Sequence, residues 1–362
     1  MTEYKIKTPE KGYMIEIDEN LDGLKECLDK ISFSGKACII SCDDVWSVHG
    51  DLLKNALKDL DVKIFELILD KDFDCTDISA FDRAYTLFTD NSFTRNDFVI
   101  AFGGRQICEY AGFAAATFKR GLKLIEIPTS LLSMSMSVGS RAGGCLKAER
   151  GNISLIYHPV LVFMDTEFAL TLSPADYYSG FADIMRAAIV KSSSVYEWLI
   201  DKLYEISERD PQIVRDMVEQ TVSLKKIYAD KDIKGVNESL LYDLGAYTAD
   251  AIYETEPDRT YGEALALGTI VNAYISMKKE MLSLEEYLEI RDMFVPFNLP
   301  ITIDKKDTDA LLKKIRKNAQ IAGNGFVLLK KIGKAVICEV SDEEIKAALD
   351  EISFSDDDFV VE

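Results

Sequence analysis

The segment from Asp97 to Gly121, DFVIAFGGRQICEYAGFAAATFKRG, constrains the fold more than any other part of this 362-residue chain. Its apolar run FVIAF is typical of a buried parallel strand. Gly103 and Gly104 follow, and glycine permits both a positive φ and the close approach of a ligand to the backbone. The run YAGFAAA then predicts a helix enclosed by other layers. A strand, a double glycine and a helix N-terminus form a diphosphate-binding geometry, although most Gly-Gly pairs are plain turns.

The first half of the chain alternates between strand-like and helix-like segments. Residues 1 to about 30 predict short strands and a helix, and apolar runs predict a buried strand at 37–41 and further strands at 63–69 and 124–128. A helix is expected over about 45–59, with Val48 and Leu52 on its apolar stripe. This alternation predicts an α/β fold with a mostly parallel sheet.

Asp43 follows the strand expected at 37–41. An acidic residue just past the carboxyl end of a strand holds a ribose or caps the next helix. We therefore include Asp43 among the candidate cofactor-binding residues.

The pattern changes near residue 172, where long segments with a 3.6-residue period begin. Ser173 and Pro174 are typical of a helix start, and a hairpin is expected over 325–340 before a last helix. We expect an α/β nucleotide-binding domain over 1–170 and a mainly α-helical domain over 171–362. The expected helical segments are 175–204, 211–230, 237–254, 261–279 and 284–294.

Composition excludes several classes of protein. The net charge of −20 argues against nucleic acid or an anionic membrane surface as a partner. Seven cysteines without CxxC spacing indicate reduced thiols, and no apolar run approaches 18 residues. The N-terminus lacks the apolar core of a signal peptide. We expect a soluble, cytoplasmic protein.

The stretch FVIAFGGRQICEYAGFAAATFKRGLKLIEIPTSLL closely resembles the matching segment of 3-dehydroquinate synthase and its sugar-phosphate cyclase relatives. The resemblance extends over about residues 35 to 350 in the family's order and spacing. It implies an N-terminal nucleotide-binding α/β domain, a helical metal-binding domain and a homodimer. Family members use NAD and a divalent metal, normally zinc, to eliminate phosphate from a seven-carbon sugar phosphate and close a ring. The implied partner of this chain is therefore a phosphorylated polyol or sugar.

The resemblance assigns cofactor binding to the glycine loop and its surroundings. Gly103 and Gly104 match the family pattern, whereas Arg105 replaces its third glycine and Glu109 its aspartate. The Arg105 side chain can block a pyrophosphate or contact it. The candidate cofactor-binding residues are Asp43, Gly103, Gly104, Arg105, Glu109 and Thr129.

The metal-ligand positions depart from the family pattern. A glutamate and two histidines hold the family's metal, and these positions fall on Asp183, Ala246 and Tyr261, while Asp250 replaces a further histidine. Alanine cannot ligate, so zinc with histidine ligands is excluded here. Asp183, Asp250 and Tyr261, with Asp243 nearby, can form an oxygen-rich site for magnesium or manganese. Alternatively, Asp183 pairs with an arginine one turn away.

Four cations fall at the family's phosphate- and substrate-binding positions. Two match in residue type, and two are arginines in place of lysines, which keep the charge but not the shape. Together they predict a remnant anion pocket, or they neutralise interior aspartates instead. These residues are Arg120, Arg141, Arg186 and Lys225.

Two functions remain open from the sequence. One is a divergent sugar-phosphate cyclase or lyase that binds NAD or a phosphorylated polyol, with an unusual oxygen-rich metal site or none. The other is a non-catalytic family member, a binding or regulatory subunit that retains the fold and an anion pocket.

Overall fold

The computed structural model describes residues 1–8, 12–70, 78–139, 141–146, 149–232, 238–256, 258–304, 308–323 and 325–354. The chain forms two compact units. The first comprises Met1–Leu172 and Val214–Gly235, and the second comprises Ser173–Ile213 and Val236–Glu362. The two-domain division at residue 170 stays a prediction, and the return of the chain to the first unit at Val214 was not expected.

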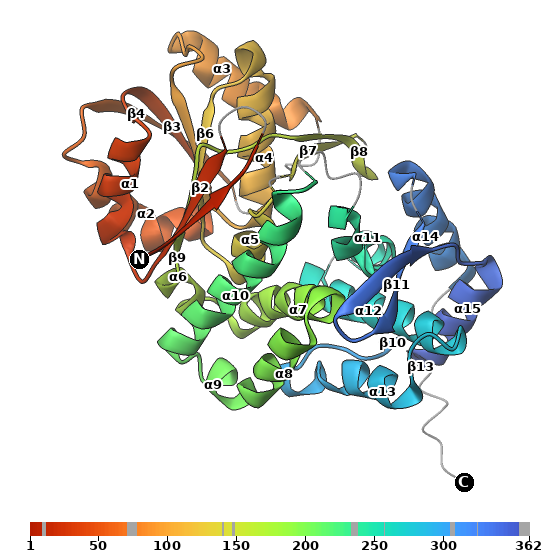
Figure 1. Ribbon diagram of the computed structural model, residues 1–362. Coiled ribbons are helices and arrows are strands. Elements are labelled where there is room, and N and C mark those ends of the chain that lie inside the picture. Colours follow the sequence, from red (N-terminus) through yellow and green to blue (C-terminus); the bar gives the residue numbers. More distant parts are fainter. Residues whose placement is uncertain are drawn as a thin grey trace. The chain divides into compact units, whose positions relative to one another are not determined.

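The first unit is built on a seven-stranded sheet with the order β1-β2-β9-β6-β5-β3-β4 (Figure 1). Only β1 and β2 pair antiparallel, and all other neighbours are parallel, which confirms the expected mostly parallel sheet. The strands are β1 (Thr2–Ile6), β2 (Tyr13–Asp18), β3 (Gly35–Cys42), β4 (Val62–Leu69), β5 (Phe98–Gly103), β6 (Lys123–Pro128) and β9 (Leu161–Asp165).

Helices cover both faces of this sheet. Trp46 packs edge-on against Phe102 on one face, with ring centroids 6.4 Å apart. On the other face, Tyr110 belongs to an apolar core that includes Val99 and Ala101. The helices of this unit are α1 (Leu24–Lys30), α2 (Asp43–Leu57), α3 (Asp82–Asp90), α4 (Arg105–Thr117), α5 (Leu131–Met136), α6 (Glu167–Leu170) and most of α10 (Pro211–Ala229), and β7 (Arg141–Leu146) and β8 (Glu149–Ile156) form a hairpin.

The apolar stripe expected on α2 is only partly buried. Leu53 and Leu57 face the core, whereas Val48 and Leu52 are 65% and 55% exposed. The sequence pattern marked the apolar positions of this helix correctly, but the sheet buries only one side of that broad stripe.

Helix α10 lies against the edge strand β1. The Thr2 hydroxyl donates to Glu219 Oε1 at 2.7 Å, and Ser223 Oγ lies 3.1 Å from the Tyr4 hydroxyl. Arg215 links Glu219 to Glu19, with N···O distances of 3.0 and 2.8 Å. These polar contacts attach a helix from the second half of the sequence to the first strand of the chain.

The second unit is mainly helical, as expected. Ser173 caps α7 by accepting from the Asp176 amide, with Pro174 in the first turn. The segment expected as one helix over 175–204 is divided at Ser192, and that expected over 237–254 is divided before Gly245, which has a φ of 73°. The helices are α7 (Pro174–Lys191), α8 (Ser193–Asp201), α9 (Leu203–Ser207), α11 (Ala246–Thr255), α12 (Tyr261–Lys278), α13 (Leu284–Asp292), α14 (Thr308–Ala322) and α15 (Asp342–Glu351).

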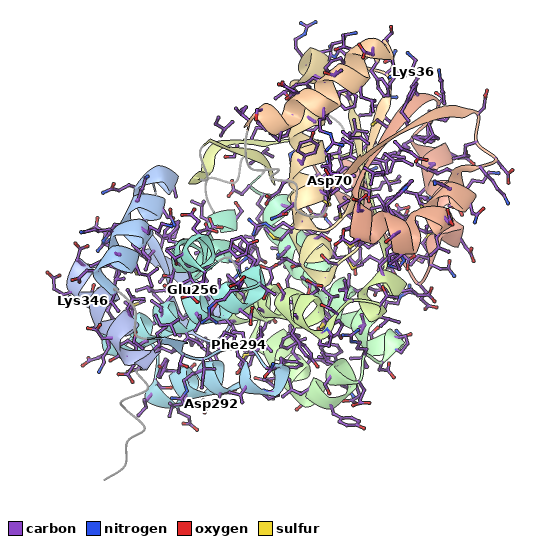
Figure 2. All side chains as sticks on the ribbon, turned by 180° about the vertical axis from the view of Figure 1, so that it is seen from behind. Lys36, Asp70, Glu256, Asp292, Phe294 and Lys346 are labelled. Carbon is purple, nitrogen blue, oxygen red and sulfur yellow. The ribbon has the colours of Figure 1, made fainter. Side chains whose placement is uncertain are left out.

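Two short sheets complete the second unit. The expected hairpin is formed by β11 (Phe326–Lys331) and β12 (Lys334–Cys338), and β10 (Ile303–Asp304) pairs with β13 (Ser353–Phe354). Helix α12 is buried along most of its length, and charged side chains such as Asp292 and Lys346 lie at the periphery of the unit (Figure 2). None of the helices within the described part of the chain combines the length and apolarity needed to cross a bilayer.

Candidate functional site

The strand order of the first unit reverses between β3 and β5. From β3 the chain continues to β4 on one side, whereas β5 and β6 lie on the other side. In open parallel sheets, ligands bind outside the carboxyl ends of the strands at such a switch point. Cys42 ends β3 and Gly103 ends β5, so this edge is the candidate site.

Gly104 is the N-cap of α4 and has an ordinary backbone conformation. Its φ is −72° and its ψ is −174°, and Gly103 is not among the residues with positive φ. The pair therefore does not use the positive φ that glycine permits. The strand runs directly into the helix without a left-handed turn.

Packing explains one glycine of the pair and not the other. A Cβ on Gly103 would lie 2.8 Å from the Cβ of Ile107, so the first turn of α4 requires glycine there. A Cβ on Gly104 would come no closer than 3.8 Å to any atom outside its neighbours, the nearest being Ser130 Oγ. The room for a Cβ beside Gly104, in van der Waals contact with Ser130 Oγ, lies at the first turn of α4, where helix amides have no partner within the helix. Such a space suits a phosphate group.

Arg105 and Glu109 form an ion pair along α4. Arg105 Nε lies 2.8 Å from Glu109 Oε1, one turn further into the helix. This contact draws the Arg105 side chain toward the second turn and offsets its charge. The pair therefore favours an open helix N-terminus over one that arginine blocks.

Thr129 and Asp43 lie on either side of the glycine pair. The Thr129 amide donates to the Gly103 carbonyl at 3.0 Å, which joins the ends of β6 and β5. Asp43 is exposed in the first turn of α2, directly after β3. The structure thus brings all six candidate cofactor-binding residues to one edge of the sheet.

Glu126 was not identified from the sequence. It lies on β6, is 5% exposed, and its Oε2 has no hydrogen-bond partner in the described part of the chain. Burial raises its pKa to about 7. After burial, the charge of Glu126 contributes to raising the pKa of the Cys108 thiol in the first turn of α4. A charged residue inside the apolar run KLIEIP was the available signal.

The candidate cations of the first unit lie on separate elements. Lys225 is buried, and its Nζ donates to the Ser135 carbonyl on α5 at 3.0 Å. Arg120 is exposed beyond the other end of α4, about 20 Å along the helix from Gly104 at 1.5 Å per residue. Arg141 begins β7, and its side chain lies outside the described part. A shared anion pocket remains a prediction.

In the second unit, Asp183 and Arg186 form an ion pair one turn apart on α7. Their side chains are 0% and 7% exposed. Arg186 Nε is buried and has no hydrogen-bond partner among the residues that the structure describes. The sequence spacing had indicated this pairing as the alternative to metal ligation.

Glycine contacts fix the helices that carry the other candidate ligands. A Cβ on Gly262 would lie 2.2 Å from the Ser179 Cα, so the start of α12 touches α7 one turn before Asp183. Tyr261 precedes this contact and packs edge-on against Tyr253 of α11, with ring centroids 5.7 Å apart. Asp250 is half-buried on α11, and Asp243 ends the short 3₁₀ helix before it.

Comparison with known proteins identifies the family. Models of 3-dehydroquinate synthase match this chain, the N-terminal model over residues 67–179 and the C-terminal model over residues 180–320. A 3-dehydroquinate synthase from Nitratiruptor sp. is 30% identical over 345 residues, which cover 92% of this chain and 93% of that protein. The chain belongs to the 3-dehydroquinate synthase family. A relative from Clostridium botulinum is 28% identical and covers 96% of this chain and 100% of its own length.

Solved structures share the fold. A 2-epi-5-epi-valiolone synthase from Streptomyces hygroscopicus with NAD+ and Zn2+ bound superposes with a TM-score of 0.86 at 19% identity, covering 96% of this chain and 98% of that one. A 2-deoxy-scyllo-inosose synthase complexed with carbaglucose-6-phosphate, NAD+ and Co2+ also gives 0.86, at 21% identity and 97% and 99% coverage. These likenesses confirm a sugar-phosphate cyclase fold.

The residues of this family member fit the dinucleotide better than the metal. The room beside Gly104 and the first turn of α4 accommodate a diphosphate. At the metal-ligand positions, Asp183 is engaged by Arg186, and position 246 is alanine. Among the described residues, no group of three or more His, Cys, Asp or Glu side chains is placed to hold a metal ion. The donor set does not fit a catalytic zinc ion.

Proposed function

We propose that this protein binds NAD at the carboxyl edge of β3, β5 and β6 and acts on a phosphorylated polyol or sugar as a divergent member of the 3-dehydroquinate synthase family. The observation that carries the proposal is Gly104, because neither its backbone conformation nor its packing accounts for a glycine. Glycine is also a favoured N-cap residue, and at this position it leaves the backbone accessible to a ligand.

Each candidate residue has a defined part in this proposal. The first-turn amides of α4 bind the diphosphate, and the helix dipole favours its negative charge. Asp43, exposed beyond β3, accepts hydrogen bonds from a ribose. Thr129 keeps the end of β6 against Gly103, so the edge is formed before the ligand arrives. NAD, when bound, supplies reversible hydride transfer.

A glycine substitution tests the dinucleotide site. Gly104→Ala and Gly104→Val place carbon atoms beside the first turn of α4, so we expect the affinity for NAD to fall at least tenfold, more for valine, while the less favourable N-cap lowers stability by only about 1 kcal/mol. Isothermal titration with NAD measures the first quantity and thermal unfolding the second. Ala116→Val, near the other end of α4, is the control and retains NAD binding.

Two outcomes would contradict the dinucleotide site. Equal NAD affinity in the wild type and both Gly104 variants would place the cofactor elsewhere. A wild type that binds no NAD would remove the cofactor from the proposal altogether.

The ion pair of Asp183 and Arg186 favours loss of the zinc-dependent reaction. We propose either a cyclase or lyase that works without histidine-ligated zinc, or a non-catalytic binding or regulatory subunit. Phosphate release from the family's seven-carbon sugar phosphate separates them, measured with NAD and with EDTA, zinc or manganese. Release in EDTA supports the enzyme, and no release under any condition supports the subunit.

We further propose a cytoplasmic homodimer, and light scattering after size exclusion measures its mass.

A further inference from the structure

We propose that Glu126 couples the diphosphate site at Gly104 to pH, so that NAD binds to this edge of the sheet together with a proton. The Glu126 carboxyl group lies beneath the first turn of α4 and repels a bound diphosphate only when it is ionised. Binding of the cofactor therefore favours the protonated carboxyl group. This inference rests on the proposed function, because it describes a further property of the same dinucleotide site.

The register of the sheet places Glu126 close to the glycine pair. Glu126 lies opposite Ala101 on β5, two residues or about 7 Å before the level of Gly103. Opposite residues point to the same face of a sheet, so Glu126 shares the face of Ala101, in the apolar core to which α4 contributes. The Cys108 thiol in the first turn of α4 lies on this face, 3.7 Å from the Gly103 carbonyl oxygen. The carboxyl group is therefore beneath the turn that is proposed to bind the diphosphate.

Neighbouring elements enclose this side chain. Both α4 and α5 pack against β6, and Val162 of β9 lies beside Glu126 on the other side from β5. Glu126 is buried, and its Oε2 has no hydrogen-bond partner within the described part of the chain. A buried carboxylate without a cation is unfavourable, and its charge is screened much less than a charge on the surface. A diphosphate bound at the edge of the sheet makes the ionised form less favourable still.

Among the described residues, the causes that set the pKa of Glu126 include no cation. Burial raises this pKa to about 7, and the Ser137 hydroxyl at the end of α5 lowers it to a smaller extent. On α4, burial raises the pKa of the Cys108 thiol well above its usual value and the charge of Glu126 adds to this shift, so the thiol stays neutral near pH 7. Glu109 on the same helix is paired with Arg105. The Glu126 carboxyl group is therefore the one of these groups that changes its charge near neutral pH.

The sign of the coupling follows from this placement. Below the pKa of about 7, the Glu126 carboxyl group is protonated and does not repel the diphosphate. Above this value the ionised form weakens binding, and bound NAD raises the pKa of Glu126 because it favours the neutral form. The affinity for NAD therefore falls as the pH rises through 7, and it levels off once the carboxylate stays ionised in the complex.

Isothermal titration with NAD tests this coupling in the wild type without any substitution. Titrations at pH 6.0 and 8.5 give the change in affinity, and titrations at pH 7.5 in two buffers of different ionisation enthalpy give the number of protons taken up. We expect roughly three- to sevenfold weaker binding at pH 8.5 and the uptake of about 0.3–0.5 of a proton per NAD at pH 7.5. ADP-ribose, which carries the same diphosphate, should show the same change.

Two substitutions assign the effect to Glu126. Glu126→Gln keeps the shape of the side chain and cannot ionise, so it should bind NAD at both pH values as tightly as the wild type does at pH 6.0, without proton uptake. Asp165→Asn is the matched control, because burial raises the pKa of Asp165 to about 7 as well. Asp165 ends β9 three residues after Val162, so its side chain is on the opposite face of the sheet. This control should retain the pH dependence.

Equal NAD affinity of the wild type at both pH values would overturn the inference. A pH dependence that survives in Glu126→Gln, or one that Asp165→Asn removes, would also overturn it. The proton uptake of the wild type needs no variant, so it decides the matter even where a substitution prevents folding. A wild type that binds NAD equally at both pH values retains the dinucleotide site and loses only this coupling, whereas one that binds no NAD loses both.

Discussion

Glu126 places an ionisable group inside the central sheet, and its burial makes stability depend on pH. Its carboxyl group titrates near 4.5 when unfolded and near 7 when folded. The folded state therefore binds more protons between these values. The protonated carboxyl group adds to the free energy of unfolding below pH 4.5, and this contribution is lost as the pH rises through 7. At higher pH, burial of the charged carboxylate lowers the free energy of unfolding. Asp165, whose pKa burial also raises to about 7, acts in the same direction.

Glu126→Gln should remove the free-energy cost of burying a charged carboxylate at high pH. We expect the variant to match the wild type near pH 4.5 and to gain roughly 3 kcal/mol in free energy of unfolding at pH 8, at 1.36 kcal/mol per pKa unit. Urea unfolding at both values measures the difference. Glu66→Gln, on the edge strand β4 with a 39% exposed side chain, is the control substitution at an exposed position. An equal difference between Glu126→Gln and the wild type at both pH values would contradict the expectation.

The sequence predicted contacts between residues close along a helix, but not the surroundings of single side chains. The spacing of Asp183 and Arg186 indicated their ion pair, because residues three apart meet on a helix. The unpaired Nε of Arg186 depends on everything packed around it, and no local pattern contains that information. The role of Gly104 likewise required knowing that there is room for a Cβ beside it.

At the scale of elements, close helix contacts define the second unit. The backbones of α11 and α12 meet where a Cβ on Gly268 would lie 2.2 Å from the Gly245 carbonyl oxygen. Gly268→Ala should lower the free energy of unfolding by roughly 1–3 kcal/mol or more, because neither backbone can yield without moving a helix. Gly104→Ala is the matched control and should change stability by less. Denaturant unfolding compares the two, and equal losses would contradict the expected contact.

Most elements followed from local sequence. Apolar runs marked β3, β5 and β6, and Ser173 and Ser341 marked two helix starts because their side chains accept the first free amides. The break between α7 and α8 was missed, although Ser192 caps α8 in the same way. Apolar periodicity continues across that cap, so the period alone could not locate the break.

At the scale of the whole molecule, the first unit is discontinuous in sequence. Residues 1–172 alone lack α10 and its contacts to Thr2 and Tyr4. We expect this fragment to be less stable to urea than residues 1–235, with faster amide exchange in β1. Matching unfolding curves and exchange rates for the two fragments would contradict a structural role for α10. The sequence could not predict that α10 belongs to the first unit, because α10 has the same helical periodicity as its neighbours in sequence.

The same arrangement has a consequence during synthesis. The ribosome finishes β1 first, but the helix that covers it is made only after α7, α8 and α9. At roughly 5–20 residues per second, many seconds pass between the synthesis of β1 and the synthesis of α10. An edge strand left open for that time can pair with other newly made chains. The nascent protein therefore passes through a period in which the edge of β1 is open to pairing with other chains.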